Sequence, residues 1–137
     1  MKPFVRVCES MVLRRCIVVC CGPKPSVKKL FLDPETFHGS SCSKRFLMEK
    51  WRVVEKAWDK VCGEHGGAYG FTLKDEGDVY VVLPKWDSRV FVHEAYHAVQ
   101  AVLSIIGTQD EELGAYLVEW LFEEICWSPP KQGKRGK

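Results

Sequence analysis

The segment Ser88-Arg-Val-Phe-Val-His-Glu-Ala-Tyr-His-Ala-Val-Gln-Ala-Val-Leu-Ser-Ile-Ile106 decides how this chain folds. It contains neither proline nor glycine, and its apolar side chains recur at helical spacing. One stripe is formed by Phe91, Ala95, Ala98, Val102 and Ile106, with Val99 and Leu103 beside it. Asp87 or Ser88 can cap the start, and Gly107 can end the helix. The segment therefore predicts an amphipathic helix that packs against a neighbouring element.

The same segment carries His93-Glu94-Ala-Tyr-His97, which is an H-E-x-x-H motif. Residues four apart share one face of a helix, so both imidazoles can bind the same metal ion. Glu94 is offset by one residue and can reach a water molecule held by that metal. The motif predicts a zinc site with His93 and His97 as ligands and Glu94 as general base. The alternative is a surface helix with two unrelated histidines.

A catalytic zinc site usually has three protein ligands, and residues 108–125 offer carboxylates for the third. This segment predicts a second helix that folds back on the first, because a single glycine separates the two. Thr108 and Glu111 match a capping box, which leaves Glu112 as the freer carboxylate. We therefore predict Glu112 as the third metal ligand, with Glu111 and Glu119 as alternatives.

His93-Glu-x-x-His97 followed by a glutamate on the next helix resembles the gluzincin branch of zinc metallopeptidases, the thermolysin-like group. The third ligand of that branch lies in Asn-Glu-x-x-Ser-Asp, and the corresponding stretch here is Glu111-Glu112-Leu-Gly-Ala115-Tyr116. The ligand glutamate maps to Glu112, whereas Tyr116 replaces the Asp that supports a ligand histidine. The chain looks like the compact minigluzincin type and is similar to small phage-encoded HExxH proteins, over roughly residues 78–125.

The resemblance implies an α+β fold: a compact zincin-like domain with a small, mainly antiparallel sheet, an HExxH helix and a following helix that carries the third ligand. It also implies a zinc-dependent hydrolase, most simply a peptidase acting on peptide or protein substrates, with Zn²⁺ as cofactor. An additional oxyanion donor is expected, and Tyr96, Tyr116 and His65 are the candidates.

Two rival interpretations stay open. One is a zinc-containing binding or assembly protein, of the phage-encoded kind, that keeps the zincin fold without appreciable protease activity. The other is a helical interaction domain without metal. The intact Glu94 favours the enzyme over the binding protein, because a structural zinc site needs no general base.

Upstream of the motif, the residue pattern predicts strands at 11–21 and 28–32 and a helix over 43–62. Residues 69–73 and 79–83 flank a turn-forming segment and predict a β-hairpin. In the resembling peptidases, the edge of the strand before the HExxH helix pairs with an extended substrate. We therefore predict 79–83 as a substrate-binding edge, with a purely structural hairpin as the alternative.

The chain has 137 residues, which predicts one compact domain over 1–128. Residues 129–137 carry four positive charges after Pro129-Pro130, and without them 16 basic residues stand against 18 acidic ones. We predict a disordered basic tail and expect no nucleic-acid partner.

Seven cysteines occur at irregular spacings, with no C-x-x-C pair. This pattern predicts buried, reduced thiols and a cytoplasmic protein. Cys16, Cys20 and Cys21 are candidates for a second metal site, although a buried strand also explains them. No apolar run is long enough to cross a membrane, and residues 16–21 are too short for the core of a signal peptide.

Overall fold

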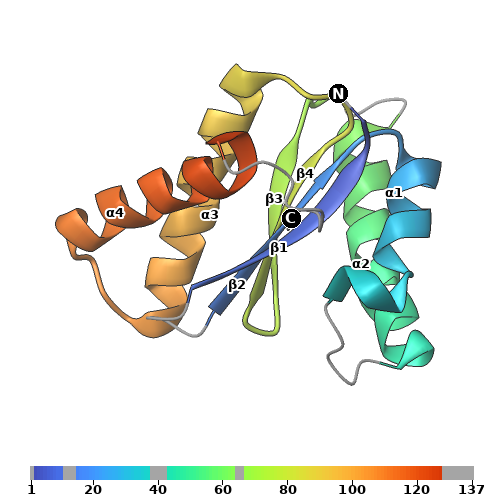
Figure 1. Cartoon of the computed structure of the whole chain (residues 1–137), viewed down its shortest axis with the longest axis horizontal. Helices are drawn as coiled ribbons and strands as arrows, with labels where there is room; N and C mark the ends of the chain where they lie inside the picture. The colour runs from blue at the N-terminus through green and yellow to red at the C-terminus, as the bar shows by residue number, and fades with distance from the viewer. Residues whose placement is uncertain (1, 11–14, 38–42, 64–66, 128–137) are drawn as a thin grey trace, which may run out of the picture.

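A four-stranded sheet separates two pairs of helices (Figure 1). The structure is a computed structural model and describes residues 2–10, 15–37, 43–63 and 67–127. The strands are β1 (Phe4–Ser10), β2 (Arg15–Cys21), β3 (Phe71–Asp75) and β4 (Asp78–Leu83). One face is covered by α1 (Lys24–Phe31) and α2 (Lys44–Cys62), the other by α3 (Ser88–Ile106) and α4 (Glu111–Phe122). A 3₁₀ turn η1 (Pro34–Phe37) and a π-helical turn η2 (Glu123–Trp127) complete the described elements. The α+β class is confirmed.

The sheet is mixed, with strand order β1-β2-β4-β3. β1 and β2 are antiparallel, as are β3 and β4, whereas β2 and β4 run parallel with Ile17 opposite Val79. β4 therefore lies inside the sheet, and the prediction that 79–83 offers a free edge is wrong. β3 is the edge strand on this side. A hairpin sequence does not show which of its two strands pairs with a third, and here the parallel pairing with β2 occupies β4.

The two central strands are buried on both faces, as their continuous apolar sequences favour. Ile17, Val19, Val79, Val81 and Leu83 belong to the core under α3 and α4. Val18, Cys20, Tyr80 and Val82 belong to the core under α1 and α2. A fully buried aliphatic side chain of this kind contributes roughly 1.5–3 kcal/mol of hydrophobic stabilisation. The two cores together hold the helices on the sheet.

The N-terminal region differs from its predicted elements. Phe4–Ser10 forms β1, which the sequence pattern did not indicate. The predicted strand 28–32 is wrong, because most of this segment lies in α1. Proline is tolerated in a first helical turn, where its missing N–H would have no intrahelical partner. The buried pair Val27 and Phe31, four residues apart, then packs this helix on the sheet. Of the predicted strand 11–21, residues 15–21 form β2 and residues 11–14 lie outside the described residues.

The predicted helices over 43–62 and 88–106 are confirmed. Ser43 caps α2, since its hydroxyl accepts a hydrogen bond from the Phe46 N–H. Asp87 caps α3 by accepting from the Arg89 and Val90 N–H groups. Gly107 ends α3 with φ at 80°, a left-handed conformation that glycine adopts without steric cost.

The second helix of the hairpin begins at Glu111, and the predicted capping box of Thr108 with Glu111 is wrong. Asp110 is the N-cap, because its Oδ1 accepts from the Glu112 and Leu113 N–H groups at 2.9 and 3.2 Å. The Thr108 hydroxyl instead accepts from the Asp110 N–H within the loop. Aspartate is a stronger cap than threonine, so the helix starts after the aspartate.

The described cysteines are thiols; Cys8, Cys20 and Cys21 are buried as predicted, whereas Cys126 is exposed. This agrees with the predicted reduced state for those residues, while Cys42 lies outside the described part of the chain. The predicted tail, 129–137, lies outside it as well. Within the described ranges, no helix combines the length and the apolar character needed to cross a membrane.

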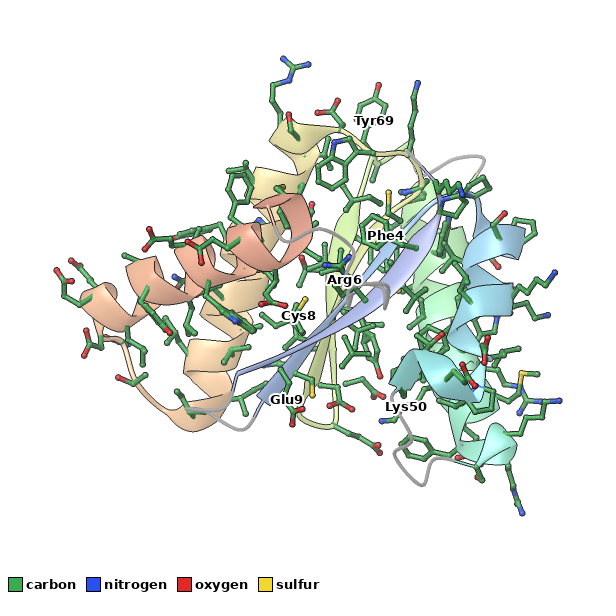
Figure 2. All side chains as sticks on the ribbon, in the orientation of Figure 1. Phe4, Arg6, Cys8, Glu9, Lys50 and Tyr69 are labelled. Atoms are coloured by element: carbon green, nitrogen blue, oxygen red, sulfur yellow. The ribbon has the colours of Figure 1, made fainter. Side chains whose placement is uncertain are left out.

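A side chain of β1 makes a hydrogen bond to η2, the turn that follows α4. Phe4, Arg6 and Cys8 follow one another at alternate positions of β1 (Figure 2). Phe4 and Cys8 pack into the core under α3 and α4, and the Arg6 guanidinium donates to the Glu124 carbonyl in η2. This contact holds the C-terminal turn against the first strand.

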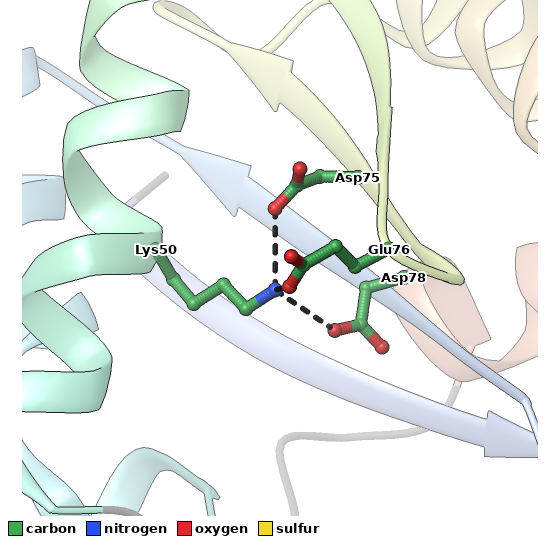
Figure 3. Close-up of polar contacts among 4 residues, drawn as sticks. All are labelled: Lys50, Asp75, Glu76 and Asp78. Carbon is green, nitrogen blue, oxygen red and sulfur yellow. Dashed lines mark hydrogen bonds and ion pairs between the residues drawn. The ribbon is translucent and has the colours of Figure 1, made fainter.

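The β3–β4 hairpin is attached to α2 by a buried lysine (Figure 3). Glu76 and Gly77 have positive φ angles, 51° and 87°, which is typical of a tight two-residue turn. Lys50 Nζ lies 3.2 Å from Asp75, 2.8 Å from Glu76 and 3.9 Å from Asp78. Burial lowers the pKa of Lys50, but the hydrogen bonds and charges of Glu76 and Asp75 outweigh it and raise that pKa above 10.5. Lys50 therefore stays charged although its side chain is buried.

Replacing Lys50 by Met should lower the free energy of unfolding by about 1–2 kcal/mol, because the hairpin carboxylates lose their shared cation. The melting temperature should fall by about 3–8 °C. The pKa is raised in the folded state, so the contribution is present below the unfolded pKa of about 10.4 and is lost as pH rises through the folded value. Thermal melts at pH 7 and pH 11 measure this, with Lys56→Met on the exposed face of α2 as control. An equal difference between wild type and Lys50→Met at both pH values would contradict the assignment.

Candidate metal site on α3

The two motif histidines lie next to each other on the exposed side of α3. Their Nε2 atoms are 3.1 Å apart, and the rings meet edge to face at 82°. Two nitrogen ligands of one tetrahedral zinc ion, each at 2.0–2.1 Å, are separated by about 3.3 Å. The same separation also fits an N–H···N hydrogen bond between neutral imidazoles. His93 and His97 are therefore already spaced as a pair of metal ligands.

Glu94, unlike the two histidines, lies in the contact between α3 and β3. Its side chain is only 8% exposed, and it is one of two buried charged residues found among those described. Thr72 Oγ1 of β3 lies 2.7 Å from Glu94 Oε1 and 3.1 Å from the Glu94 carbonyl oxygen. A buried carboxylate needs such a donor, because an unpaired buried charge is costly. The predicted general base is thus held by the edge strand.

The close approach of α3 to β3 depends on Gly70. A Cβ atom at this position would lie 2.8 Å from Val90 Cγ1 and 3.0 Å from the Val82 carbonyl oxygen. It would also lie 3.6 Å from Glu94 Cγ. A side chain here would push α3 away from the strand, and glycine therefore lets Glu94 reach Thr72.

Glu94 contributes to the lining of two open depressions at the surface. One, of about 600 Å³, is lined by Tyr69, Gly70, Asp87, Arg89, Val90, His93 and Glu94. The other, of about 400 Å³, is lined by Gly70, Phe71, Thr72, Lys74, Glu94, His97 and Ala101. Tyr69 stands at the rim near the start of α3 and is 80% exposed (Figure 2). Each depression is therefore lined by Glu94, by one of the two motif histidines and by Gly70, the residue before β3.

The predicted third ligand, Glu112, lies in the first turn of α4 and is exposed. No group of three His, Cys, Asp or Glu side chains placed to hold a metal is found among the described residues. A groove of about 1340 Å³ between α3 and α4 is lined on the α4 side by Glu111 and Glu119, and on the α3 side by Tyr96 and Gln100. The histidines and Glu94 are thus assembled, while Glu112 remains a prediction.

The two described candidates for the oxyanion donor, Tyr96 and Tyr116, lie on different helices. Tyr96 is 56% exposed, and its ring centroid lies 6.0 Å from that of His97. Tyr116 is 54% exposed on α4. His65 lies outside the described residues. Of the two described candidates, Tyr96 is the one with a ring contact to a motif histidine.

Three residues near Glu94 were absent from the sequence-based candidates. Gly70 and Thr72 belong to the segment predicted as a strand, and Lys74 lies at alternate spacing from Thr72 along it. Alternation puts Thr72 and Lys74 on one face. Only the packing of β3 against α3 shows that this face borders the motif.

Cys62, at the end of α2, lies within electrostatic range of Glu94. Burial first, and then the negative charge of Glu94, raise the pKa of the Cys62 thiol. A thiol whose pKa is raised reacts slowly with alkylating agents, because the thiolate is the nucleophile. Cys62 therefore reports on the charge at position 94.

In comparisons with known protein families, curated proteins and solved structures, no match to this chain is found.

Glu94→Gln should increase the alkylation rate of Cys62 about twofold at pH 8, because removal of the carboxylate charge lowers the pKa of the thiol. Peptide mapping by mass spectrometry after timed iodoacetamide treatment gives the rate. Cys126 is the internal control, since burial alone raises the pKa of its thiol. A Cys62 rate unchanged from wild type would place Glu94 too far away to act on the thiol.

Proposed function

We propose that this protein is a zinc-dependent hydrolase, most simply a small metallopeptidase with a zincin-like active site. The supporting observation is the arrangement of three side chains on α3. The Nε2 atoms of His93 and His97 lie 3.1 Å apart, and the carboxylate of Glu94 is held by a hydrogen bond from Thr72 of β3. The resemblance of the motif and of Glu112 to the gluzincins supports the same proposal.

His93 and His97 supply two of the ligands, and we propose Glu112 as the third. When bound, zinc lowers the pKa of a water ligand toward about 7 and polarises a carbonyl oxygen. Glu94 accepts a proton from the attacking water and returns it to the leaving amine. The two depressions that Glu94 lines leave room for a peptide next to this carboxylate.

A second candidate function is a zinc-containing binding or assembly protein without appreciable turnover. It is favoured by the openness of the site, where depressions at the surface and the exposed rings of Tyr69 and Tyr96 suit a macromolecular surface. The two functions share the metal and differ in whether Glu94 acts as a base.

Purified protein should contain one Zn²⁺ per chain after metal-replete preparation. Replacing His93 or His97 by Ala should lower the zinc affinity by at least about 100-fold, because a direct ligand contributes more than its supporting groups. Elemental analysis and competition with a chromophoric chelator measure both quantities. The variants Glu111→Ala, Glu112→Ala and Glu119→Ala then identify the third ligand. A loss of zinc affinity confined to Glu111→Ala or Glu119→Ala would show that Glu112 is not the third ligand.

Glu94→Gln should keep zinc and fold but abolish hydrolysis, because the amide has nearly the same shape and cannot accept the proton. A loss of about 100-fold or more in kcat is expected, measured on a library of internally quenched peptides with zinc-loaded protein. Equal cleavage by wild type and Glu94→Gln would show that the base lies elsewhere. Zinc binding without cleavage by wild type would favour the binding or assembly protein.

A further inference from the structure

We propose that Thr72 is the positioning residue of this site: its hydroxyl fixes the Glu94 carboxylate in the orientation that a general base requires. The catalytic part of this proposal rests on the proposed hydrolase function. The positioning itself rests on the contact between β3 and α3 and can be tested separately.

The hydrogen-bond geometry assigns one oxygen of Glu94 to Thr72. A hydroxyl has a single proton to donate, and two acceptors lie within reach: Glu94 Oε1 at 2.7 Å and the Glu94 carbonyl oxygen at 3.1 Å. The shorter contact is to the ionised group, and charge-assisted hydrogen bonds are the stronger kind. Thr72 therefore engages Oε1, which leaves Oε2 as the oxygen available to accept a proton in the proposed mechanism.

The position of Thr72 in the sheet makes this contact rigid. Thr72 lies opposite Val81 in the β3–β4 ladder, and Val81 is fully buried under α3. Gly70, two residues earlier, keeps the strand close to Val90 and Glu94. The backbone on both sides of the hydrogen bond is thus held by packing, so the hydroxyl limits the rotation of a long glutamate side chain.

The outer edge of β3 also explains why a side-chain donor is used. Among the described strands β3 pairs with β4 alone, and Phe71, Thr72 and Lys74 of β3 line one of the depressions that contain Glu94. A side-chain hydroxyl can hold Oε1 without using a backbone group of that edge. The hydrogen bond that fixes Glu94 therefore uses no backbone N–H or C=O group of β3.

The test compares Thr72→Val, which removes the hydroxyl at nearly constant shape, with Thr72→Ser, which keeps it. In the zinc-loaded full chain, Thr72→Val should lower kcat on the quenched-peptide library by about 10- to 100-fold, with KM and zinc affinity within about twofold of wild type. Thr72→Ser should restore kcat to within about threefold. A Thr72→Val enzyme with wild-type kcat, or a Thr72→Ser enzyme as impaired as Thr72→Val, would overturn the proposal.

A double-mutant cycle in urea separates this proposal from the proposed function. Thr72→Val and Glu94→Ala should be non-additive, with the double variant less destabilised than the two single changes together, because each removes the same hydrogen bond. This result is expected even if wild-type protein cleaves no peptide, in which case the hydrolase function fails and the positioning of Glu94 stands. Additive effects would show that Thr72 does not hold Glu94, whatever the activity.

Discussion

The packing of α3 onto the sheet is the contact on which the rest of this structure depends. Phe91, Ala95 and Ala98 are fully buried, and two of these are alanines, whose small side chains bring the helix close to β4 and β3. Gly70 contributes on the strand side, because a side chain at this position would clash with Val90 of α3. Because α3 lies this close, one helix can take part in the core and carry chemically active groups at its margin.

The H-E-x-x-H motif is divided by this packing into two environments. His93 and His97 remain on the exposed side, where their Nε2 atoms lie 3.1 Å apart. Glu94 is turned toward the sheet and is buried, so it needs a hydrogen-bond partner that solvent cannot provide. Thr72 supplies that partner from the edge strand. Two imidazoles at the surface and a buried carboxylate on the same helix are the arrangement on which the proposed zinc site rests.

The acidic face of α4 has a different relation to the site. Its glutamates are solvated. Glu111 and Glu112 both lie in the first turn, but only Glu111 and Glu119 are among the residues that line the groove facing α3. Asp110 caps this helix and so determines where each glutamate points. The proposed third ligand, Glu112, therefore belongs to a solvated helix start that the Asp110 cap fixes in place.

The sequence by itself determined the features that depend on neighbours along the chain. The i, i+4 spacing of the histidines, the capped helix around them and the hairpin with its Glu76-Gly77 turn follow from local backbone geometry. Tertiary structure alone decided that β4 is internal and β3 is the edge, since that depends on a parallel partner distant in sequence. It also decided that residues 28–31 continue a helix, because Val27 and Phe31 are buried against the sheet and the preceding prolines are compatible with a first helical turn. Tertiary structure also decided the hydrogen-bond partner of Glu94. Thr72 is 22 residues away in the sequence, and only the packing of β3 against α3 brings its hydroxyl to the carboxylate.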